Sequence, residues 1–551
     1  MKTLLLSTLL ILALLSCKQQ DINDQKLTFL RTSGHDMVNE KGEKVFLKGV
    51  GLGNWMLPEG YMWRFGTEGD RPRRIERIVS DLIGKEAADS FWTVYRRDYV
   101  TEKDIEQIAA LGFNSVRPAL NARIFLTEGE NPQFLQEGFD LLDSLINRCS
   151  RHNLYVILDM HGAPGGQTGQ NIDDSEFDEP RLYIEPEKYE PLLTKLWVKL
   201  AEKYKDNPTV AGYDLLNEPL PKMTGAADKY KHLIEPLYQR LTTAIRAVDK
   251  KHMIILEGAD WSNDWSVFSK PFDSNLVYQF HYYCWDSFEN VNSIERYITK
   301  RKEWNTPVWV GETGEKTAAI HWATIQLLNE NNIGWSFWPW KKLDTRKAGN
   351  NPYSIVKPEG WDSIVAYSHL KEASYKEWAR PVFNQFLNNI KLENCTQNTE
   401  MINAMMHRIP CLIEAENFGG KGLGISYTVK DTTKCKNYRR TESVKISYFI
   451  EATDSTRSHG QYITLQQDEW TAYNFDALTT MCEQATIKVR ALQPNAALEI
   501  SVNNEEHQEF TLENQDWVVL QIDPIEFDEI GNTLQLNVTS GSVEIDYIDI
   551  R

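Results

Sequence analysis

The sequence predicts an α/β fold, a (β/α)8 TIM barrel followed by a jelly-roll-like C-terminal β-sandwich. Before residue 392, short apolar segments alternate with amphipathic helical segments, which is typical of a parallel α/β architecture. Eight such apolar segments occur, as a closed barrel requires. After residue 392 the chain changes to short alternating runs separated by Asn, Gly, Asp and Pro, as in a sandwich. The expected barrel strands are 45–50, 114–117, 154–158, 210–216, 253–256, 276–283, 308–312 and 333–338.

Helical periodicity fills the segments between these strands and gives the domain boundaries. We expect helices near residues 71–110, 138–152, 187–205, 225–250, 316–330 and 361–390. The 551 residues exceed what one hydrophobic core usually supports, so more than one domain is expected. We assign residues 31–392 to the barrel, the polar residues 393–410 to a linker, and residues 411–551 to the sandwich.

The N-terminus has the layout of an export signal. Lys2 precedes an uncharged, Leu-rich stretch, residues 4–15, which is too short to span a bilayer as a mature helix. The following L-L-S-C resembles a bacterial lipobox, in which Cys17 becomes the lipidated first residue. We therefore expect an exported lipoprotein with signal 1–17 and tether 18–30, facing the periplasm or the cell surface. The alternative is an ordinary cleaved signal with an accidental cysteine.

The charge balance restricts the partners. A net charge of −18 and an isoelectric point near 5.2 argue against nucleic acid and anionic membrane surfaces, because both repel an acidic protein. The only membrane contact expected is the lipid anchor. A neutral substrate fits better, and the 17 Trp residues mildly suggest sugar rings, which stack on aromatic faces.

Two glutamates end apolar strand-like runs. In G-Y-D-L-L-N-E-P-L, residues 212–220, the run stops at Pro219, which cannot donate to a sheet, and leaves Glu218 at the strand tip. Glu312 holds the same kind of position after the run 306–310. Catalytic groups lie at this end of barrel strands, and retaining glycoside hydrolysis needs two carboxyl groups about 5–5.5 Å apart. The pair therefore predicts glycosidase chemistry; the alternative for each residue is a solvated loop acid.

The motif L-N-E-P at residues 216–219 resembles the acid/base motif of glycoside hydrolase family 5, a family of retaining barrel enzymes. Matches to the other motifs of this family follow in order, each near an expected strand end, and the resemblance covers roughly residues 40–390. The matching positions are Arg117, His161, Asn217, Glu218, His281, Tyr283, Glu312 and Trp338.

The resemblance implies how these residues act. Glu218 is expected to be the general acid/base with a raised pKa, and Glu312 the nucleophile. Arg117 and the Tyr283 hydroxyl are expected to keep Glu312 ionised. Asn217 is expected to hydrogen-bond the sugar 2-hydroxyl, a contact that strengthens in the transition state.

The same resemblance implies the residues that bind the sugar. His161 and His281 are expected to orient groups and to contact sugar hydroxyls, although a satisfied core histidine is the alternative for each. Trp338 is expected to form the floor of the −1 subsite, with barrel packing as its alternative. Trp55 and Trp285 are further subsite candidates.

Three stretches are similar to the exo-β-1,3-glucanase-like branch of the family: G-L-G-N-W at 51–55, H-G-A-P-G at 161–165 and W-S-F-W-P-W-K at 335–341. This branch implies a β-glucan substrate, with β-1,3 linkages favoured. The insert 167–186 and G-E-T-G at 311–314 depart from it, and such loops build subsites, so linkage and exo or endo mode stay open. The alternatives are β-1,4-glucan, β-1,6-glucan, mannan or xylan, or a non-catalytic carbohydrate-binding protein.

The C-terminal region resembles carbohydrate-binding module family 6. The matching stretches are I-E-A-E-N at 413–417, D-E-W-T-A-Y at 468–473 with 487–490, and I-D-Y-I at 545–548. Glu544 stands where the family often has a ligand Asn, so sugar binding by this region stays open.

No cofactor is expected, and a structural calcium ion in the C-terminal region is the alternative to solvated acidic residues there. Its oxygen ligands would be Glu414, Glu416 and Asp549, for which solvation is the alternative. A metal-dependent barrel hydrolase would need paired histidines on one strand, whereas D-M-H at 159–161 offers one. No zinc spacing appears among the cysteines after Cys17: two are expected to be free buried thiols, and the pairing of the other four stays open. These six are Cys149, Cys284, Cys395, Cys411, Cys435 and Cys482.

Overall fold

The structure is a computed structural model. It describes residues 26–284, 294–343, 350–435, 438–449, 460–505, 508–513 and 515–551. The predicted signal peptide with Cys17, most of the predicted tether, and Trp285 lie outside these residues. In the described part of the chain, no helix is both long and apolar enough to cross a membrane.

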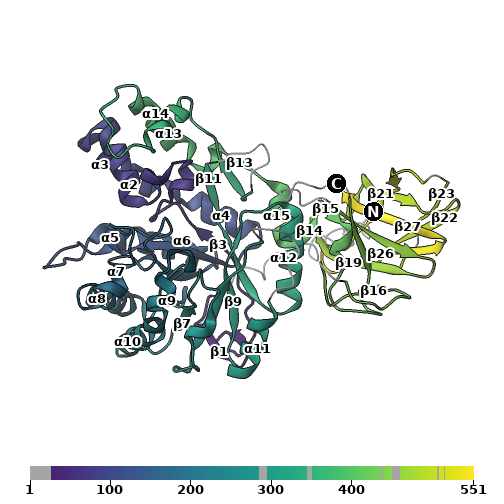
Figure 1. The fold of residues 1–551 in the computed structure, drawn as a ribbon, viewed down its shortest axis with the longest axis horizontal. Helices are drawn as coiled ribbons and strands as arrows, with labels where there is room; N and C mark the ends of the chain where they lie inside the picture. Colours follow the sequence, from purple (N-terminus) through teal and green to yellow (C-terminus); the bar gives the residue numbers. More distant parts are fainter. Residues whose placement is uncertain are drawn as a thin grey trace, which may run out of the picture.

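Eight parallel strands form a closed barrel, which confirms the predicted fold class. Their order around the barrel is β10-β3-β4-β5-β6-β7-β8-β9 (Figure 1). All are buried on both faces, as expected where helices cover a parallel sheet, and this explains their nearly unbroken apolar character. The strands are β3 Lys48–Leu52, β4 Ser115–Asn121, β5 Tyr155–Gly162, β6 Val210–Asp214, β7 Met253–Glu257, β8 Leu276–His281, β9 Val308–Gly314 and β10 Gly334–Trp338.

The helices surround the barrel, but three predicted helical segments are each divided. The segment 71–110 forms three helices, because Gly84 adopts a φ of 83° and Thr101 begins a new helix with a capping box to Asp104. The segments 225–250 and 361–390 each form two. The helices are α2 Pro72–Ile83, α3 Lys85–Tyr99, α4 Glu102–Ala110, α5 Ala122–Phe125, α6 Gln136–Arg151, α7 Arg181–Ile184, α8 Pro186–Tyr204, α9 Ala226–Tyr230, α10 Ile234–Arg246, α11 Glu295–Trp304, α12 Ala318–Glu330, α13 Trp361–Tyr367, α14 Ala379–Asn389 and α15 Thr399–Met406.

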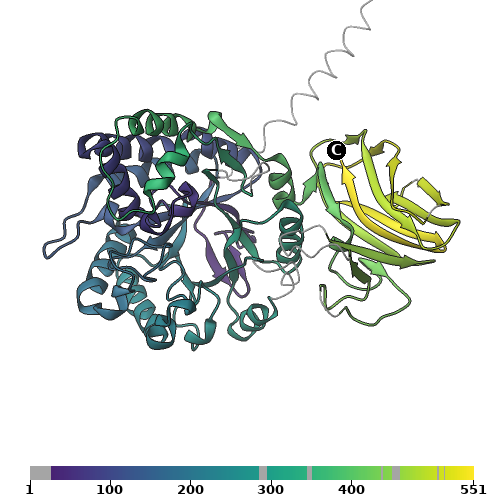
Figure 2. The same ribbon diagram turned by 45° about the horizontal axis from the view of Figure 1, so that its top comes forward.

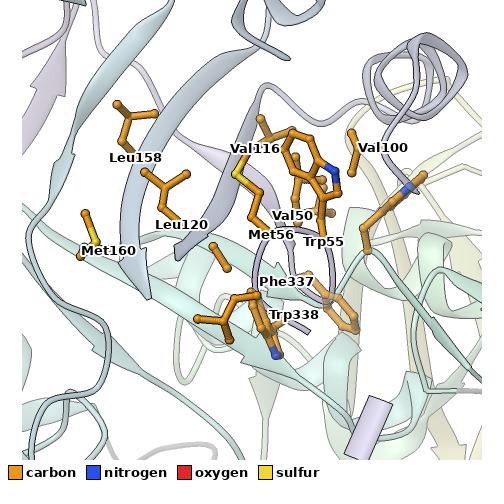
Figure 3. Close-up of a cluster of buried hydrophobic side chains, with 14 of the residues drawn as sticks. Val50, Trp55, Met56, Val100, Val116, Leu120, Leu158, Met160, Phe337 and Trp338 are labelled. Carbon is orange, nitrogen blue, oxygen red and sulfur yellow. The ribbon is translucent and has the colours of Figure 1, made fainter. Parts of the chain in front are cut away.

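One apolar cluster joins the barrel strands to the segment that follows β3. Figure 3 shows part of it, with Trp55 and Met56 lying near Val50 and Val116. Full burial of side chains of this size contributes roughly 1.5–3 kcal/mol each. The cluster therefore fixes the segment after β3 against the barrel.

Segment 393–410, predicted as a linker, is folded onto the barrel. Its strand β13 (Cys395–Gln397) pairs with β12 (Tyr353–Ile355), which pairs with β11 (Lys341–Leu343). Helix α15 buries Met401 and Met405 in the barrel cluster. The methionines of this segment therefore pack against the barrel.

Two six-stranded sheets form the C-terminal region, as predicted for a sandwich (Figure 2). Buried and less buried residues alternate along their strands, for example in β26, so that one face of each sheet enters a common apolar core. The first sheet contains β14 Arg408–Ile409, β19 Trp470–Ala477, β26 Asn532–Ser540, β22 Ala496–Val502, β23 Gln508–Leu512 and β16 Tyr427–Thr428. The second contains β17 Lys445–Tyr448, β18 Gln461–Gln466, β27 Ser542–Ile550, β21 Ala485–Ala491, β24 Val518–Ile522 and β15 Cys411–Glu414.

Helix α12 connects the barrel to this region, and it lies between them in Figure 1. The Trp322 side chain belongs to the core of the sandwich and packs on His407, with ring centroids 4.1 Å apart. The Gln326 amide donates to the Phe418 carbonyl at 2.7 Å. Nine of the 13 residues of α12 are buried, so both halves of the molecule depend on this helix.

Candidate active site

Glu218 and Glu312 lie together at the mouth of the barrel. Glu218 follows β6 with a φ of 46°, while Glu312 lies within β9. The two side chains are almost buried, at 7% and 4% exposure. Oxygens of both carboxylates and a nitrogen of His281 all lie within 4.8 Å of one another. The two predicted glutamates therefore converge although they come from strands on different sides of the barrel.

Arg117, on β4, connects the groups of the site. Its fully buried guanidinium donates to Glu312 at 2.6 Å and to the Asn217 side-chain oxygen at 2.9 Å. It also donates to Asp214 and Glu257, each at 2.9 Å. Since a guanidinium stays charged at all relevant pH values, it supplies a permanent positive charge beside Glu312.

Four buried polar residues of the site were not predicted from the sequence. Three of them, Asp159, Asp214 and Glu257, are fully buried carboxylates beside Arg117. Glu257 accepts the backbone N–H of Glu218 at 2.7 Å and so fixes the turn that carries it. The fourth, Gln279, donates to Glu257 at 2.7 Å. Asp214 and Glu257 are the last residues of β6 and β7, so a polar residue at the end of an apolar run was their signal. Asp159 and Gln279 lie inside β5 and β8, each two residues before a histidine.

His281 stands between the two glutamates. Its Nδ1 atom is 2.6 Å from Glu218 and 3.5 Å from Glu312. Burial lowers the pKa of His281, but the charges of Glu257, Glu312 and Glu218 outweigh burial and raise that pKa well above its ordinary value. A protonated His281 thus places a second positive charge in the site.

The environments shift the pKa values of the two glutamates in opposite directions. Burial raises the pKa of Glu218, and the opposing effect of His281 only partly offsets it. Burial also acts on Glu312, but the charges of His281 and Arg117 prevail and lower its pKa. The Tyr283 hydroxyl donates to Glu312 at 3.0 Å. One carboxyl is thereby suited to be a proton donor and the other to stay ionised.

His161, Asn217 and Trp338 form one connected wall. His161 Nδ1 lies 2.8 Å from the Asp159 carboxylate, which only accepts, so Nδ1 is the donor. The other ring nitrogen, Nε2, then accepts from the Asn217 amide at 3.2 Å. The Trp338 ring stacks on His161 with centroids 5.0 Å apart and planes 10° from parallel. Its indole N–H donates to the Tyr61 hydroxyl at 3.1 Å.

These groups surround a cavity of about 720 Å³. Most of the predicted site residues line this cavity or contact a residue that lines it. Glu59, Tyr61 and Trp261 also line the cavity and were not predicted. Burial and the nearby Glu312 and Glu315 raise the pKa of Glu59 well above its ordinary value. The predicted lining residues are His161, Glu218, His281, Tyr283, Glu312 and Trp338.

Trp55 lies away from the cavity, contrary to the prediction of a subsite role. Its side chain is 2% exposed, and the indole N–H donates to the Arg96 carbonyl at 2.7 Å. The ring belongs to the apolar cluster of Figure 3, so packing explains this tryptophan.

The positive charges of Arg117 and His281 affect whether a metal ion would fit at the barrel mouth. Three groups of acids and histidines at the barrel mouth have ligand atoms close enough for an ion. Arg117 or His281 already binds carboxylates in each group, so the positive charge that a metal would supply is present. In the C-terminal region, Asp549 pairs with Arg551 at 2.8 Å. Among the described residues, the groups whose ligand atoms lie close enough for an ion do not include Glu414, Glu416 and Asp549 together.

The described cysteines contain no disulfide. The six after Cys17 are all free, and the two expected as buried thiols, Cys149 and Cys284, are buried. Burial raises the pKa of Cys284 to about 11, so its thiol stays protonated and unreactive at neutral pH.

Known proteins that are similar in sequence to this chain have glycosidase names. Residues 81–344 match the family model described as cellulase (glycosyl hydrolase family 5). A β-xylosidase of Phanerodontia chrysosporium is 28% identical over 353 residues, 58% of this chain and 71% of that protein. A glucan 1,3-β-glucosidase of Lachancea kluyveri is 29% identical over 293 residues, 50% of this chain and 65% of that protein. A probable glucan endo-1,6-β-glucosidase B of Aspergillus flavus is 25% identical over 381 residues, 62% and 94% of the two chains.

A barrel with this carboxylate pair and these relatives is a glycoside hydrolase. Residues 81–344 are similar to glycosyl hydrolase family 5. The chain spans only part of some relatives: 65% of the L. kluyveri glucan 1,3-β-glucosidase and 60% of a glucan 1,3-β-glucosidase I/II of Saccharomyces cerevisiae.

Proposed function

We propose that this protein hydrolyses β-glycosidic bonds with retention of configuration, using Glu218 as acid/base and Glu312 as nucleophile. One observation carries the proposal: two carboxyl groups within 4.8 Å have pKa values shifted in opposite directions by named neighbours. Retaining enzymes hold these groups about 5–5.5 Å apart, whereas inverting enzymes keep them roughly 6.5–9.5 Å apart to admit a water.

The first step forms a covalent intermediate. Ionised Glu312 attacks the anomeric carbon while protonated Glu218 gives its proton to the departing glycosidic oxygen, so the leaving group departs as an alcohol. Arg117 and Tyr283 hold the attacking carboxylate in place. Asn217 keeps one amide N–H for the sugar 2-hydroxyl, since the other faces His161.

The second step returns the enzyme to its starting state. Glu218, now ionised, takes a proton from water, and the hydroxide formed attacks the anomeric carbon and releases Glu312. Two inversions give net retention. His281 stays within reach of Glu218 and stabilises its ionised form between the steps.

We propose a β-glucan as substrate, with β-1,3 linkages favoured. The stretches at 51–55, 161–165 and 335–341 and the L. kluyveri relative support this choice. A β-1,6-glucan is the second candidate, because the A. flavus relative is matched over 94% of its length. A β-xyloside is the third, from the P. chrysosporium relative.

The test is product analysis by NMR with a panel of substrates. Purified enzyme is given β-1,3-, β-1,6- and β-1,4-glucan, mannan, xylan and an aryl β-xyloside, and the anomeric protons of the first product are recorded before mutarotation. A β-anomer released from β-1,3-glucan supports the proposal. Initial α-product would refute the mechanism, and release only from another glycan would refute the substrate.

We also propose export and lipid anchoring through Cys17, supported by the apolar stretch that ends at this residue. Incorporation of labelled fatty acid by the full chain, lost in Cys17→Ser, tests the anchor.

The resemblance of residues 411–551 to carbohydrate-binding module family 6 leads us to propose glycan binding there. Retention of a Glu312→Gln variant on insoluble glucan tests this, and no retention would contradict it.

A further inference from the structure

The segment that follows the predicted tether closes the floor of the barrel, at the amino ends of its strands. Leu30 is buried there in one apolar cluster with Met253 and Trp309, which lie near the starts of β7 and β9. The barrel strands are parallel, so their amino ends lie together at the end of the barrel opposite the catalytic cavity. The chain therefore joins the barrel on its floor side.

Hydrogen bonds fix the place where the chain joins. The hydroxyl of Tyr155, the first residue of β5, donates to the Thr28 carbonyl at 3.1 Å. The Thr32 N–H donates to the side chain of Asn275, which immediately precedes β8, at 2.8 Å. Strands on two sides of the floor thus hold this segment. The exposed Lys26 beside it is the described residue nearest to the tether.

The chain between this place and Cys17 is short. Eight residues, 18–25, separate Cys17 from Lys26, and a fully extended chain of this length spans only about 30 Å. To bring the catalytic cavity against a bilayer, the tether would have to climb the barrel, whose strands rise about 20 Å at their usual tilt. It would also have to pass round the surrounding helices, each about 10 Å across, and over the mouth loops. The tether is too short for that path.

The floor also differs in charge from the molecule as a whole. The chain has a net charge of −18, yet basic residues outnumber acidic ones in the two floor segments, by 5 to 3 in 26–48 and by 3 to 1 in 246–252. Lys41, Lys44, Lys250 and Lys251 are exposed among them. An excess of basic side chains attracts the anionic headgroups of a bilayer at short range. The floor therefore suits a lipid surface better than the net charge suggests.

On the basis of the proposed lipid anchor at Cys17, we propose that the barrel floor is the membrane-facing surface of this protein and that the catalytic cavity opens away from the bilayer. The partner is the phospholipid surface into which the lipid of Cys17 inserts. A glycan then reaches Glu218 and Glu312 from the aqueous side, without passing between the protein and the membrane. The tether thus sets the orientation of the enzyme as well as its location.

Lysine acetylation measured by mass spectrometry tests this orientation. The lipidated full chain, bound to vesicles of phosphatidylcholine and phosphatidylglycerol, is compared with residues 18–551 in the presence of the same vesicles. Residues 18–551 contain every described residue but lack Cys17. The probes are exposed lysines of the floor, Lys41, Lys44 and Lys251, of the loop that follows Glu218 at the mouth, Lys222, and of the barrel side on α8, Lys195.

We expect acetylation of the three floor lysines to slow severalfold in the anchored chain, and that of Lys222 and Lys195 to stay unchanged, because a bilayer against the floor excludes the reagent there. Equal rates at all five lysines in both forms, or protection of Lys222 or Lys195, would overturn the orientation. Flotation with the vesicles tests the anchor separately. A full chain that did not float would overturn the anchor at Cys17 and, with it, the orientation.

Discussion

Two buried sets of opposite charges occur in the barrel half of the molecule, and they differ in whether a cavity adjoins them. At the mouth, Arg117 meets four carboxylates, and Glu312 among them faces the open space. In the second set, Lys341 on β11 forms an ion pair with Asp104 on α4 at 2.7 Å, and both side chains are fully buried. Asp104 also accepts the Trp340 indole N–H at 3.0 Å. Both sets are buried and charged. What distinguishes the reactive cluster around Arg117 from the structural pair of Lys341 and Asp104 is therefore access to a ligand.

The largest effect expected at the mouth is that of Glu312→Gln. Removing the ionised nucleophile should lower kcat by a factor of about 10,000 or more, because no other group can form the covalent intermediate. Steady-state kinetics on the substrate identified by NMR checks this. Unchanged circular dichroism is the control for folding, and near wild-type turnover would contradict the assignment.

The opposite pattern is expected for Asp104→Asn. This change leaves a buried lysine without its counter-charge, which destabilises proteins by about 3–5 kcal/mol. Denaturant unfolding should show the loss, while kcat/KM per folded molecule stays close to that of the wild type. If activity fell with no change in stability, the division between reactive cluster and structural pair would be wrong.

A smaller effect on rate is expected for Tyr283→Phe. Losing a hydrogen bond to a charged group costs about 1.5–3 kcal/mol, so kcat/KM should fall roughly 10- to 100-fold. The lowered pKa of Glu312 would rise towards its ordinary value, so the acid limb of the pH profile should move to higher pH.

The basic limb, where protonated Glu218 is lost, should stay in place. The matched control is Tyr278→Phe on β8, the strand that precedes Tyr283, because the buried Tyr278 hydroxyl has no hydrogen-bond partner among the described residues. An acid limb that did not move would argue against Tyr283 as a donor that keeps Glu312 ionised.

The smallest effect is expected at the surface. Lys251 and Asp206 are 2.8 Å apart, but the two side chains are 51% and 72% exposed. Exposed pairs contribute little because water screens them. Asp206→Asn should therefore leave both the melting temperature and the kinetics unchanged, and a clear shift in either would show that exposure is a poor guide to the energetics of these pairs.

Much of the site could be predicted because motifs at strand ends are local in sequence. The order of strands, and the positions of Glu218 and Glu312 at their C-terminal side, followed from apolar runs that end in polar residues. Asp159 was missed because it is a polar residue inside an apolar strand. Asp214 and Glu257 end β6 and β7, but neither belongs to a motif that singled it out. What makes them part of the site is Arg117, which is distant in sequence.

Other features depend on packing that local composition does not describe. Trp55 follows a strand as a subsite residue would, but its indole N–H meets the Arg96 carbonyl in the core. Segment 393–410 is polar overall, yet α15 buries Met401 and Met405 against the barrel. In both cases the partner lies far along the chain, where periodicity gives no information.

The position of α12 has a consequence for how this chain can be recombined. The helix connects β9, which carries Glu312, to β10, which carries Trp338, while Trp322 on its other side belongs to the sandwich core. A crossover that exchanges only residues 411–551 would leave Trp322 facing a foreign surface. The segment to exchange is therefore the sandwich together with the α12 residues that pack on it, and we expect functional chimeras to need both.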